Sequence, residues 1–258
     1  MPLKSQEIME VDCDFHASEK CHGVVKRKFG IIQANRRNNN GKFRCYPCAR
    51  RIETYGSKSP MSKYKYNYTI FENIDTEQKA YFLGWIASDG TITERMIRFR
   101  IHVYDIECVK ALRELVCPEL KLNYSRNVVG FDITSHKIAQ DACRALGISP
   151  GDKAYIIRLP KYADDKLTWA FLRGYFDGDG CACYKKGTLR NYPRATIASK
   201  SKMMLEDIKE FVKINCCISG HQVEYGGQYA MKFLSLIYAN ASIFLERKKH
   251  IYDLMLTW

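Results

Sequence analysis

Two aspartates have the type and placement for metal chemistry. Asp89 and Asp179 each end an apolar run with a glycine in its middle, YFLGWIASDG at 81–90 and FLRGYFDGDG at 171–180. Both runs have helical character, and a carboxylate at a helix C-terminus faces the negative end of the helix dipole. One such run could be an ordinary buried helix that ends in the common turn dipeptide Asp-Gly. Because the unfavourable placement occurs twice, we expect a functional reason for both acids.

The segments around the two runs carry start and stop signals for helices. Asp75 stands three residues before a glutamine, the spacing of a capping box, and Asp165 or Thr168 could cap the second run. Gly90 and Gly180 follow the acids and could take the left-handed conformation that often ends a helix. The sequence therefore predicts two helices that each end at an aspartate.

Small residues four apart predict that these two helices pack closely. Gly84 and Ser88 stand in the first run, and Gly174 and Gly178 in the second. Such spacing lets two helix backbones approach, for the steric reason best known in membrane helices. Close packing would bring both aspartates to one place, where paired carboxylates need a cation between them. Oxygen donors of this kind select Mg²⁺ or a similar hard ion.

A second candidate metal site lies near the N-terminus. Cys45 and Cys48 form a Cys-x2-Cys knuckle, and Cys13 and Cys21 precede it by about two dozen residues. Four thiolates in such a pattern are typical of a tetrahedral Zn²⁺ site in a small module. The first pair is irregular, so His16 is an alternative to Cys21, and four ordinary thiols are the plain alternative. Eleven cysteines in one chain indicate a reducing compartment rather than a disulfide framework.

Composition and charge narrow the class of protein. The chain has 258 residues with 46% hydrophobic content, enough for a substantial core, and a net charge of +13. Such a charge indicates a polyanionic partner, most simply nucleic acid, with solubility as the plain alternative. Apolar runs are too short to cross a membrane and the N-terminus lacks a signal core, so we expect an intracellular protein, in the cytoplasm or nucleus of its host cell.

The strand patterns place basic side chains on one face of a sheet. In the segment 96–104, apolar residues alternate with Arg98, Arg100 and His102. A second hairpin at 181–199 puts Arg190, Tyr192 and Arg194 on one face. A solvated face would look the same, but the net charge favours a surface that binds DNA. The DNA-binding candidates are Arg98, Arg100, His102, Lys185, Lys186, Arg190, Tyr192, Arg194, Lys200 and Lys232.

The elements after the first run recur in the same order after the second. Each half reads as helix, hairpin, helix, hairpin and helix, with one expected hairpin turning at Gly226–Gly227. We therefore expect an α+β fold made of two αββαββα repeats with two antiparallel sheets. The expected domains are a zinc-binding basic module at 1–58, a linker at 59–74, and repeats at 75–160 and 161–258.

These residues resemble a known family. The runs FLGWIASDG at 82–90 and LRGYFDGDG at 172–180 are similar to the paired motif of LAGLIDADG homing endonucleases, and the trailing segments LGISPGDKAYIIRLP and IYANASIFLERKK agree. The resemblance covers about 67–258. The overall pattern of the chain, including the cysteine-bearing leader, is similar to single-chain, free-standing members of the family from phages and large DNA viruses.

The resemblance implies a pseudo-twofold saddle that binds double-stranded DNA as a monomer and cuts both strands. It implies Mg²⁺ or Mn²⁺ held by Asp89 and Asp179, with the backbone carbonyls of Ser88 and Gly178 as further ligands. It also implies a basic residue beside each site, at Lys153 and Lys248, although the spacing alone would fit plain surface lysines equally well. The sixth motif position is Asp177 in the second repeat but an alanine in the first.

Other functions on the same fold stay open. An intron maturase would bind intron RNA and keep the basic surface. A DNA-binding regulator derived from the family would bind without cutting, and would be expected to have lost a motif aspartate. A splicing intein would need flanking blocks for which we expect no room. The resemblance therefore favours a site-specific double-strand DNA endonuclease.

Overall fold

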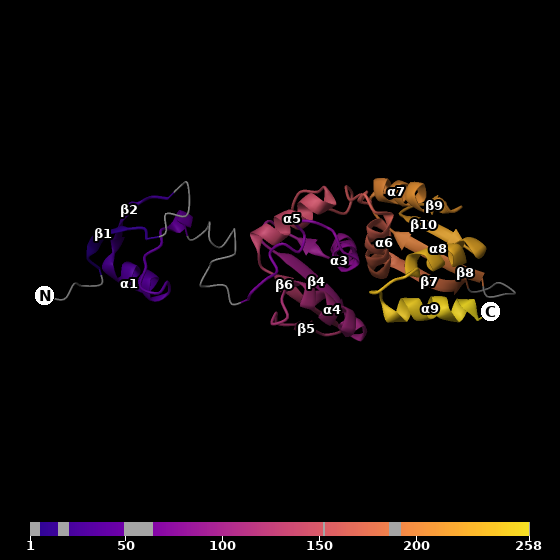
Figure 1. Cartoon of the computed structure of the whole chain (residues 1–258), viewed down its shortest axis with the longest axis horizontal. Helices are drawn as coiled ribbons and strands as arrows, with labels where there is room; N and C mark the ends of the chain where they lie inside the picture. Colours follow the sequence, from indigo (N-terminus) through magenta and orange to yellow (C-terminus); the bar gives the residue numbers. More distant parts are fainter. Residues whose placement is uncertain (1–5, 15–20, 49–63, 152, 186–191, 258) are drawn as a thin grey trace. The chain divides into compact units, whose positions relative to one another are not determined.

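The computed structural model describes residues 6–14, 21–48, 64–151, 153–185 and 192–257. It divides into two compact units (Figure 1). The cysteine unit comprises Met1–Lys65 with Ser135–Lys137, and the repeat unit comprises Tyr66–Thr134 with Ile138–Trp258. Ile70 and Phe71 are fully buried, so the compact repeat unit includes residues that we expected in the linker at 59–74.

The cysteine unit is small and built around one hairpin. Strands β1 (Ile8–Asp12) and β2 (Val24–Lys28) pair antiparallel, and helix α1 (Phe29–Arg37) follows β2 directly. The buried cluster of this unit holds three cysteines among its six members, which are Val11, Cys13, Ile32, Phe43, Cys45 and Cys48. So small an apolar core offers little stability without a further crosslink or ligand.

The first half of the repeat unit contains one four-stranded antiparallel sheet and three main helices. Its elements are α3 (Glu77–Ser88), β3 (Thr91–Ile92), β4 (Ile97–His102), the short 3-10 helix η1 (Val103–Asp105), α4 (Ile106–Val116), β5 (Asn123–Ser125), β6 (Val128–Ile133) and α5 (His136–Leu146). The strand order across the sheet is β3-β4-β6-β5.

The second half repeats this arrangement. Its elements are α6 (Asp165–Asp179), β7 (Gly180–Lys185), β8 (Tyr192–Ala198), α7 (Lys202–Val212), β9 (Cys217–Ser219), β10 (Gln222–Gly226), α8 (Gln228–Tyr238) and α9 (Glu246–Leu256). The strand order β7-β8-β10-β9 is that of the first sheet, element by element. The α+β fold with two repeats and two antiparallel sheets is thus confirmed.

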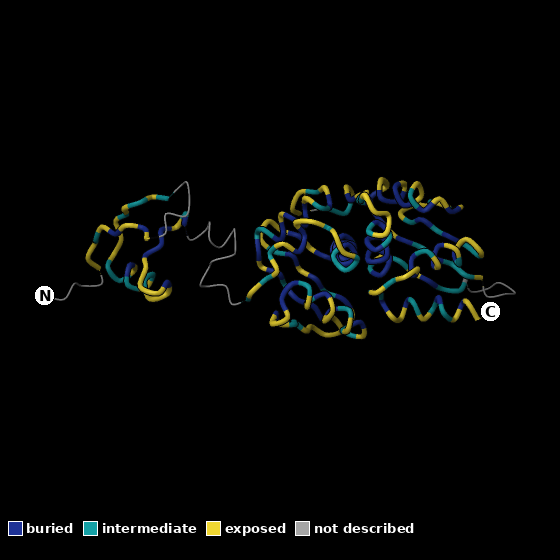
Figure 2. The backbone as a smooth tube through the Cα atoms, viewed as in Figure 1, coloured by how far each residue is buried: buried dark blue, intermediate teal, exposed yellow. Residues whose placement is uncertain are grey.

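The core of the repeat unit forms where the motif helices meet the sheets. Residues Ala80–Ala87 of α3 are all buried, and α6 is buried over most of its length (Figure 2). On the first sheet, the rings of Phe82 and Trp85 pack against Phe99 of β4, with centroids 5.7 and 5.6 Å apart. In the second half, Phe176 of α6 packs against Phe233 of α8 at 5.7 Å. Helix α3 therefore packs on the apolar face of the first sheet, and α6 packs against α8, which lies on the second sheet.

One expected hairpin is wrong. The chain after Gly226–Gly227 forms helix α8 rather than a returning strand, and β10 pairs instead with the preceding strand β9. The reason is helical spacing: Ala230, Phe233 and Ile237 fall on one buried face. Gly227 has φ of +57°, which suits a sharp entry into the helix as well as a hairpin turn.

The helix caps also differ from expectation. Thr76, not Asp75, caps α3 by accepting a hydrogen bond from the Lys79 backbone N–H at 3.3 Å. Asp164, not Asp165 or Thr168, caps α6. Within the described residues, no helix is long and apolar enough to span a bilayer.

Candidate functional site

Glycines set the distance between the two motif helices. A Cβ added at Gly84 would lie 2.1 Å from the Phe171 carbonyl oxygen, and one at Gly174 would lie 2.0 Å from the Tyr81 carbonyl oxygen. Nearer the C-termini, a Cβ at Gly178 would lie 2.0 Å from the Ser88 Oγ. Any side chain at these positions would overlap the facing helix. The close approach predicted from the small residues is therefore built into the packing of α3 against α6.

The helix ends bring the motif aspartates together. Asp89 is the C-cap of α3 and Asp179 is the last residue of α6. A Cβ at Gly178 would lie 3.1 Å from the Asp89 Oδ2, so the first carboxylate reaches the end of the second helix. The glycines after the acids are not left-handed, contrary to our expectation. Gly180 has φ of −96° and ψ of 166°, and it begins strand β7 without an intervening loop.

The two carboxylates share an electrostatic environment. Burial raises the pKa of Asp89, and the positive charges of Lys153 and Lys248 oppose that rise. Burial raises the pKa of Asp179 to about 6, and the negative charge of Asp89 adds to the rise. Two partly dehydrated carboxylates that repel each other would both be stabilised by a cation.

The two predicted lysines lie at the ends of the motif helices in matching roles. The Lys153 Nζ donates to the carbonyl oxygens of Ala87 and Ser88 at 2.7 and 2.8 Å. The Lys248 Nζ donates to the carbonyl oxygens of residues 176, 177 and 180 at 2.7, 2.8 and 2.6 Å, and to that of Gly178 at 3.5 Å. Each ammonium thus stabilises the negative end of a helix dipole beside an aspartate. Burial lowers the pKa of Lys248 to about 8, and the charge of Asp177 opposes that fall.

The donor set fits a divalent cation in part. The carboxylates are hard oxygen ligands of the kind that Mg²⁺ and Mn²⁺ prefer. The Ser88 carbonyl oxygen accepts from Lys153 at 2.8 Å, so only its second lone pair could bind a metal. The Gly178 carbonyl oxygen receives a longer bond of 3.5 Å and has more freedom. The two carboxylates are therefore the stronger candidates, and the carbonyls are secondary.

A cavity opens beside Asp179. It has a volume of 360 Å³, and its lining includes Ser88, Lys153, Tyr175, Asp179, Lys200 and His221. His221 was not among the residues predicted from the sequence. It reaches the site because the Ser199 N–H donates to the His221 carbonyl at 2.8 Å, which ties the β9–β10 turn to the end of β8. The lining therefore combines one carboxylate with two lysines and a histidine.

On the first sheet, the predicted basic side chains lie on the solvent-facing side, but they are paired. Arg98 and Arg100 contact Asp132 of β6 at 3.3 and 2.9 Å. His102 is exposed at the end of β4, and its Nδ1 accepts from the Tyr104 N–H at 3.3 Å. The face is therefore a network of charges rather than a purely basic strip.

The second sheet has the same mixture. Arg194 forms an ion pair with Glu224, and Tyr192 is exposed at the start of β8. Lys200 lies 5.7 Å from the centroid of the Tyr155 ring. Lys185 is in β7, and the remaining two predicted side chains, Lys186 and Arg190, lie outside the described residues.

Lys232 does not lie where we expected. It is an exposed residue of α8, the helix that replaces the expected second strand. The neighbouring Phe233 stacks on Tyr225 of β10, with ring centroids 4.4 Å apart, so α8 covers the apolar face of the sheet. Lys232 is therefore on the helical side, and the expectation that it lies in a strand was wrong.

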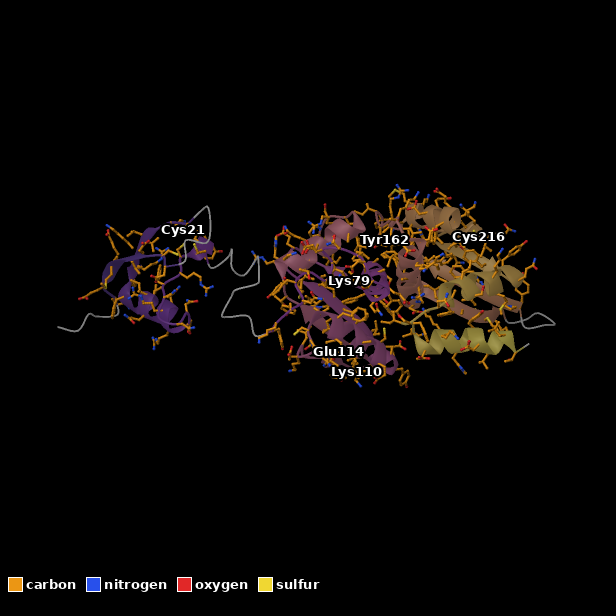
Figure 3. All side chains as sticks on the ribbon, in the orientation of Figure 1. Cys21, Lys79, Lys110, Glu114, Tyr162 and Cys216 are labelled. Carbon is orange, nitrogen blue, oxygen red and sulfur yellow. The ribbon has the colours of Figure 1, made fainter. Side chains whose placement is uncertain are left out.

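The four predicted cysteines of the cysteine unit come together. One sulfur from each of Cys13, Cys21, Cys45 and Cys48 lies within 4.8 Å of the others, and Cys21 is labelled in Figure 3. Backbone N–H groups support them: Cys45 N donates to the Cys13 Sγ at 3.3 Å, and Gly23 N to the Cys21 Sγ at 3.4 Å. Four thiols around one point are the donor set of a tetrahedral Zn²⁺ site. His16, the alternative ligand, lies outside the described residues.

Comparison with known proteins identifies the second repeat. Residues 167–215 match the family model described as a LAGLIDADG-like domain. The chain contains a LAGLIDADG-like domain. The matched residues include the second motif aspartate, and the strand order of that repeat recurs in the first. No curated protein matches the chain.

Solved structures of LAGLIDADG proteins are similar at low identity. The meganuclease I-AabMI bound to uncleaved DNA is 12% identical over 69% of this chain and 91% of that one, with a TM-score of 0.49. The homing endonuclease I-LtrWI bound to target DNA is 12% identical over 72% and 92%, with a TM-score of 0.48. Full-length DUF199/WhiA from Thermatoga maritima is 16% identical over 74% and 65%, with a TM-score of 0.42. Because all three TM-scores are below 0.5, the assignment rests on the LAGLIDADG-like domain and the repeated elements.

Proposed function

We propose that the protein is a site-specific endonuclease that cuts both strands of DNA with the help of Mg²⁺ or Mn²⁺. The observation that carries the proposal is the meeting of Asp89 and Asp179 at two adjoining helix ends, each with a lysine on the neighbouring carbonyls. Folding alone gives no reason for repelling carboxylates at the negative ends of two helices. Two such ends, related by the repeat, match two scissile phosphates related by the twofold axis of a duplex.

Each residue of the site has a proposed role. Asp89 and Asp179 hold the divalent metal, with the carbonyls of Ser88 and Gly178 as secondary ligands. When bound, the metal supplies an activated water and stabilises charge on the leaving oxygen. Lys153 and Lys248 keep positive charges beside the carboxylates. There, each ammonium attracts a phosphate and polarises a nearby water molecule. The solvent-facing sides of both sheets position the duplex, through the arginines and tyrosine already described.

The cysteine unit would hold Zn²⁺ through its four cysteines and grip the DNA backbone. In residues 1–66, lysines and arginines outnumber acids by 14 to 6, and a basic module of this kind binds phosphates without reading sequence. Zinc-bound thiolates fit a reducing compartment, so we propose that the protein is intracellular. Because its two repeats together form one pseudo-symmetric centre, we also propose that it acts as a monomer.

The test uses a library of randomised DNA duplexes with Mg²⁺, followed by sequencing of cut ends. Wild type should cut a defined subset, and Asp89→Asn and Asp179→Asn should bind those duplexes but cut at least about 100-fold more slowly, as expected for loss of a metal ligand. Equal cutting by wild type and variants would refute the proposal. Tight binding without cutting by wild type would favour a DNA-binding regulator, and selective binding of structured intron RNA would favour a maturase.

A further inference from the structure

Three polar side chains, of which Arg173 and Asp177 are buried, bind the segment that leads into α9. This segment, residues 239–245, connects α8 to the helix that carries Lys248. Glu77 of α3 accepts from the Ser242 backbone N–H at 2.9 Å and from its hydroxyl at 2.6 Å. Arg173 of α6 donates to the Ile243 carbonyl at 2.8 Å and also forms an ion pair with Glu77. We call Glu77, Arg173 and Asp177 the loop clamp.

Asp177 completes the clamp at the N-cap of α9. Its Oδ2 accepts from the Leu245 N–H at 2.8 Å and from the Tyr81 hydroxyl at 2.8 Å. Leu245 is the N-cap of α9, and its carbonyl accepts from the Lys248 N–H at 3.0 Å. The Asp177 side chain therefore fixes the turn of helix from which Lys248 reaches back to the end of α6.

The clamp has no counterpart among the residues that match it in the other repeat. The motif alignment, which places Asp89 on Asp179, also places apolar residues opposite every member of the clamp. Leu167 matches Glu77, Leu83 matches Arg173, and Ala87 matches Asp177. Even Tyr81, which donates to Asp177, is matched by a phenylalanine at 171. Lys153 and Lys248 make similar contacts with the helix ends, but the clamp binds only the segment that precedes Lys248.

Packing alone does not explain the clamp. Arg173 and Asp177 are 3% and 1% exposed, and the Asp177 Oδ1 is buried without a hydrogen-bond partner among the described residues. Buried charge and an unpaired oxygen cost stability, and the positions that match the clamp hold apolar side chains. A feature that lowers stability at one half of a pseudo-symmetric centre is expected to serve that half.

We propose that Glu77, Arg173 and Asp177 are positioning residues that fix the start of α9, and thereby Lys248, so that cutting of one DNA strand depends on them and cutting of the other does not. This inference rests on the proposed endonuclease function. The half-site that uses Lys248 is the dependent one, and the half-site that uses Lys153 is independent. Loss of the clamp therefore converts a double-strand cutter into an enzyme that nicks one strand.

The test begins with a duplex that wild type selects from the randomised library, labelled separately on each strand. At saturating duplex and Mg²⁺, Asp177→Ala should slow cutting of one strand at least about tenfold and the other less than about threefold, because small displacements of a catalytic group have large effects on rate. Asp177→Asn keeps an acceptor for the Leu245 N–H and should restore much of the lost rate. The control Val109→Ala removes buried volume from α4 and should leave the ratio of the two strand rates unchanged.

A second measurement does not depend on cleavage. Hydrogen–deuterium exchange in Asp177→Ala should speed up for the amides of 242–250 and stay unchanged for 153–158. Unchanged exchange at 242–250, or equal slowing of both strands, would overturn the inference. If wild type cuts nothing in the library, the proposed function fails and the strand dependence fails with it, while the exchange data alone decide whether the clamp holds α9.

Discussion

Replacing Gly84 by alanine should destabilise the repeat unit, although the same change stabilises most helices. In an ordinary helix interior, Gly→Ala gains about 1 kcal/mol because alanine loses less backbone entropy. Here the added Cβ would lie 2.1 Å from the Phe171 carbonyl oxygen and 2.8 Å from the Tyr175 nitrogen. Both contacts are with backbone atoms, which cannot turn aside as a side chain could. The two helices must therefore separate by about 1 Å to restore van der Waals contact.

The expected magnitude follows from that separation. Overpacking in a rigid core costs roughly 1–3 kcal/mol, and here it also loosens the packing along α3 and α6, so we expect a net loss of about 2 kcal/mol. Urea unfolding of wild type and Gly84→Ala measures the difference directly. Ser235→Ala, an exposed change in α8, provides the reference for helix propensity without a clash.

The same variant tests the site. A shift of about 1 Å between helix ends moves Asp89 away from Asp179, and a misplacement of that size can cost about 100-fold in rate. Cutting of the selected duplex should fall accordingly, under conditions in which the variant is still folded. If Gly84→Ala is more stable than wild type, or as active, the helices do not meet through these glycines and the shared site is refuted.

Two further predictions concern metal and pH. Protein purified without chelator should contain about one zinc per chain. The Cys45→Ser variant should lose this zinc, and its amides in 6–48 should lose protection from hydrogen–deuterium exchange. Zinc-free wild type would rule out the site. Burial raises the pKa of Asp177 from 3.8 to about 6, so the folded state binds this proton more tightly than the unfolded chain does. Wild type should therefore lose stability relative to Asp177→Asn as pH rises from about 4 to about 6, by on the order of 3 kcal/mol; urea unfolding across this range that gave parallel curves would contradict the assignment.

The sequence predicted the centre of the fold because the signal there is repeated. Two apolar runs with small residues four apart and a terminal acid leave few ways to pack, and Gly84 and Gly174 have the predicted role. Alternation of apolar and basic residues located strand β4, and the hairpin predicted at 181–199 is β7 paired with β8. The four cysteines were placed by their spacing, although the irregular first pair left a histidine open as a ligand.

Other features were beyond the sequence for specific physical reasons. Gly226–Gly227 has the composition of a hairpin turn, and only the packing of Phe233 on the sheet shows that a helix follows. Arg173 and Asp177 sit inside an apolar run, where they look like tolerated variation. Their partners in the segment 239–245 are backbone atoms, which carry no sequence signal. The choice of Thr76 over Asp75 as a cap depends on where the first helical turn begins, which neighbouring polar residues do not specify.

The junction at Gly180 has a consequence for how the protein could change during evolution. Because Gly180 both caps α6 and begins β7, the aspartate that would cut and the strand that would contact bases are one continuous stretch of backbone. Substitutions along β7 could change which bases are contacted, while the distance from those bases to the cut would stay fixed by the count of residues. Under the proposed function, new target sequences are accessible by point mutation, but a new spacing between recognition and cleavage requires an insertion or deletion.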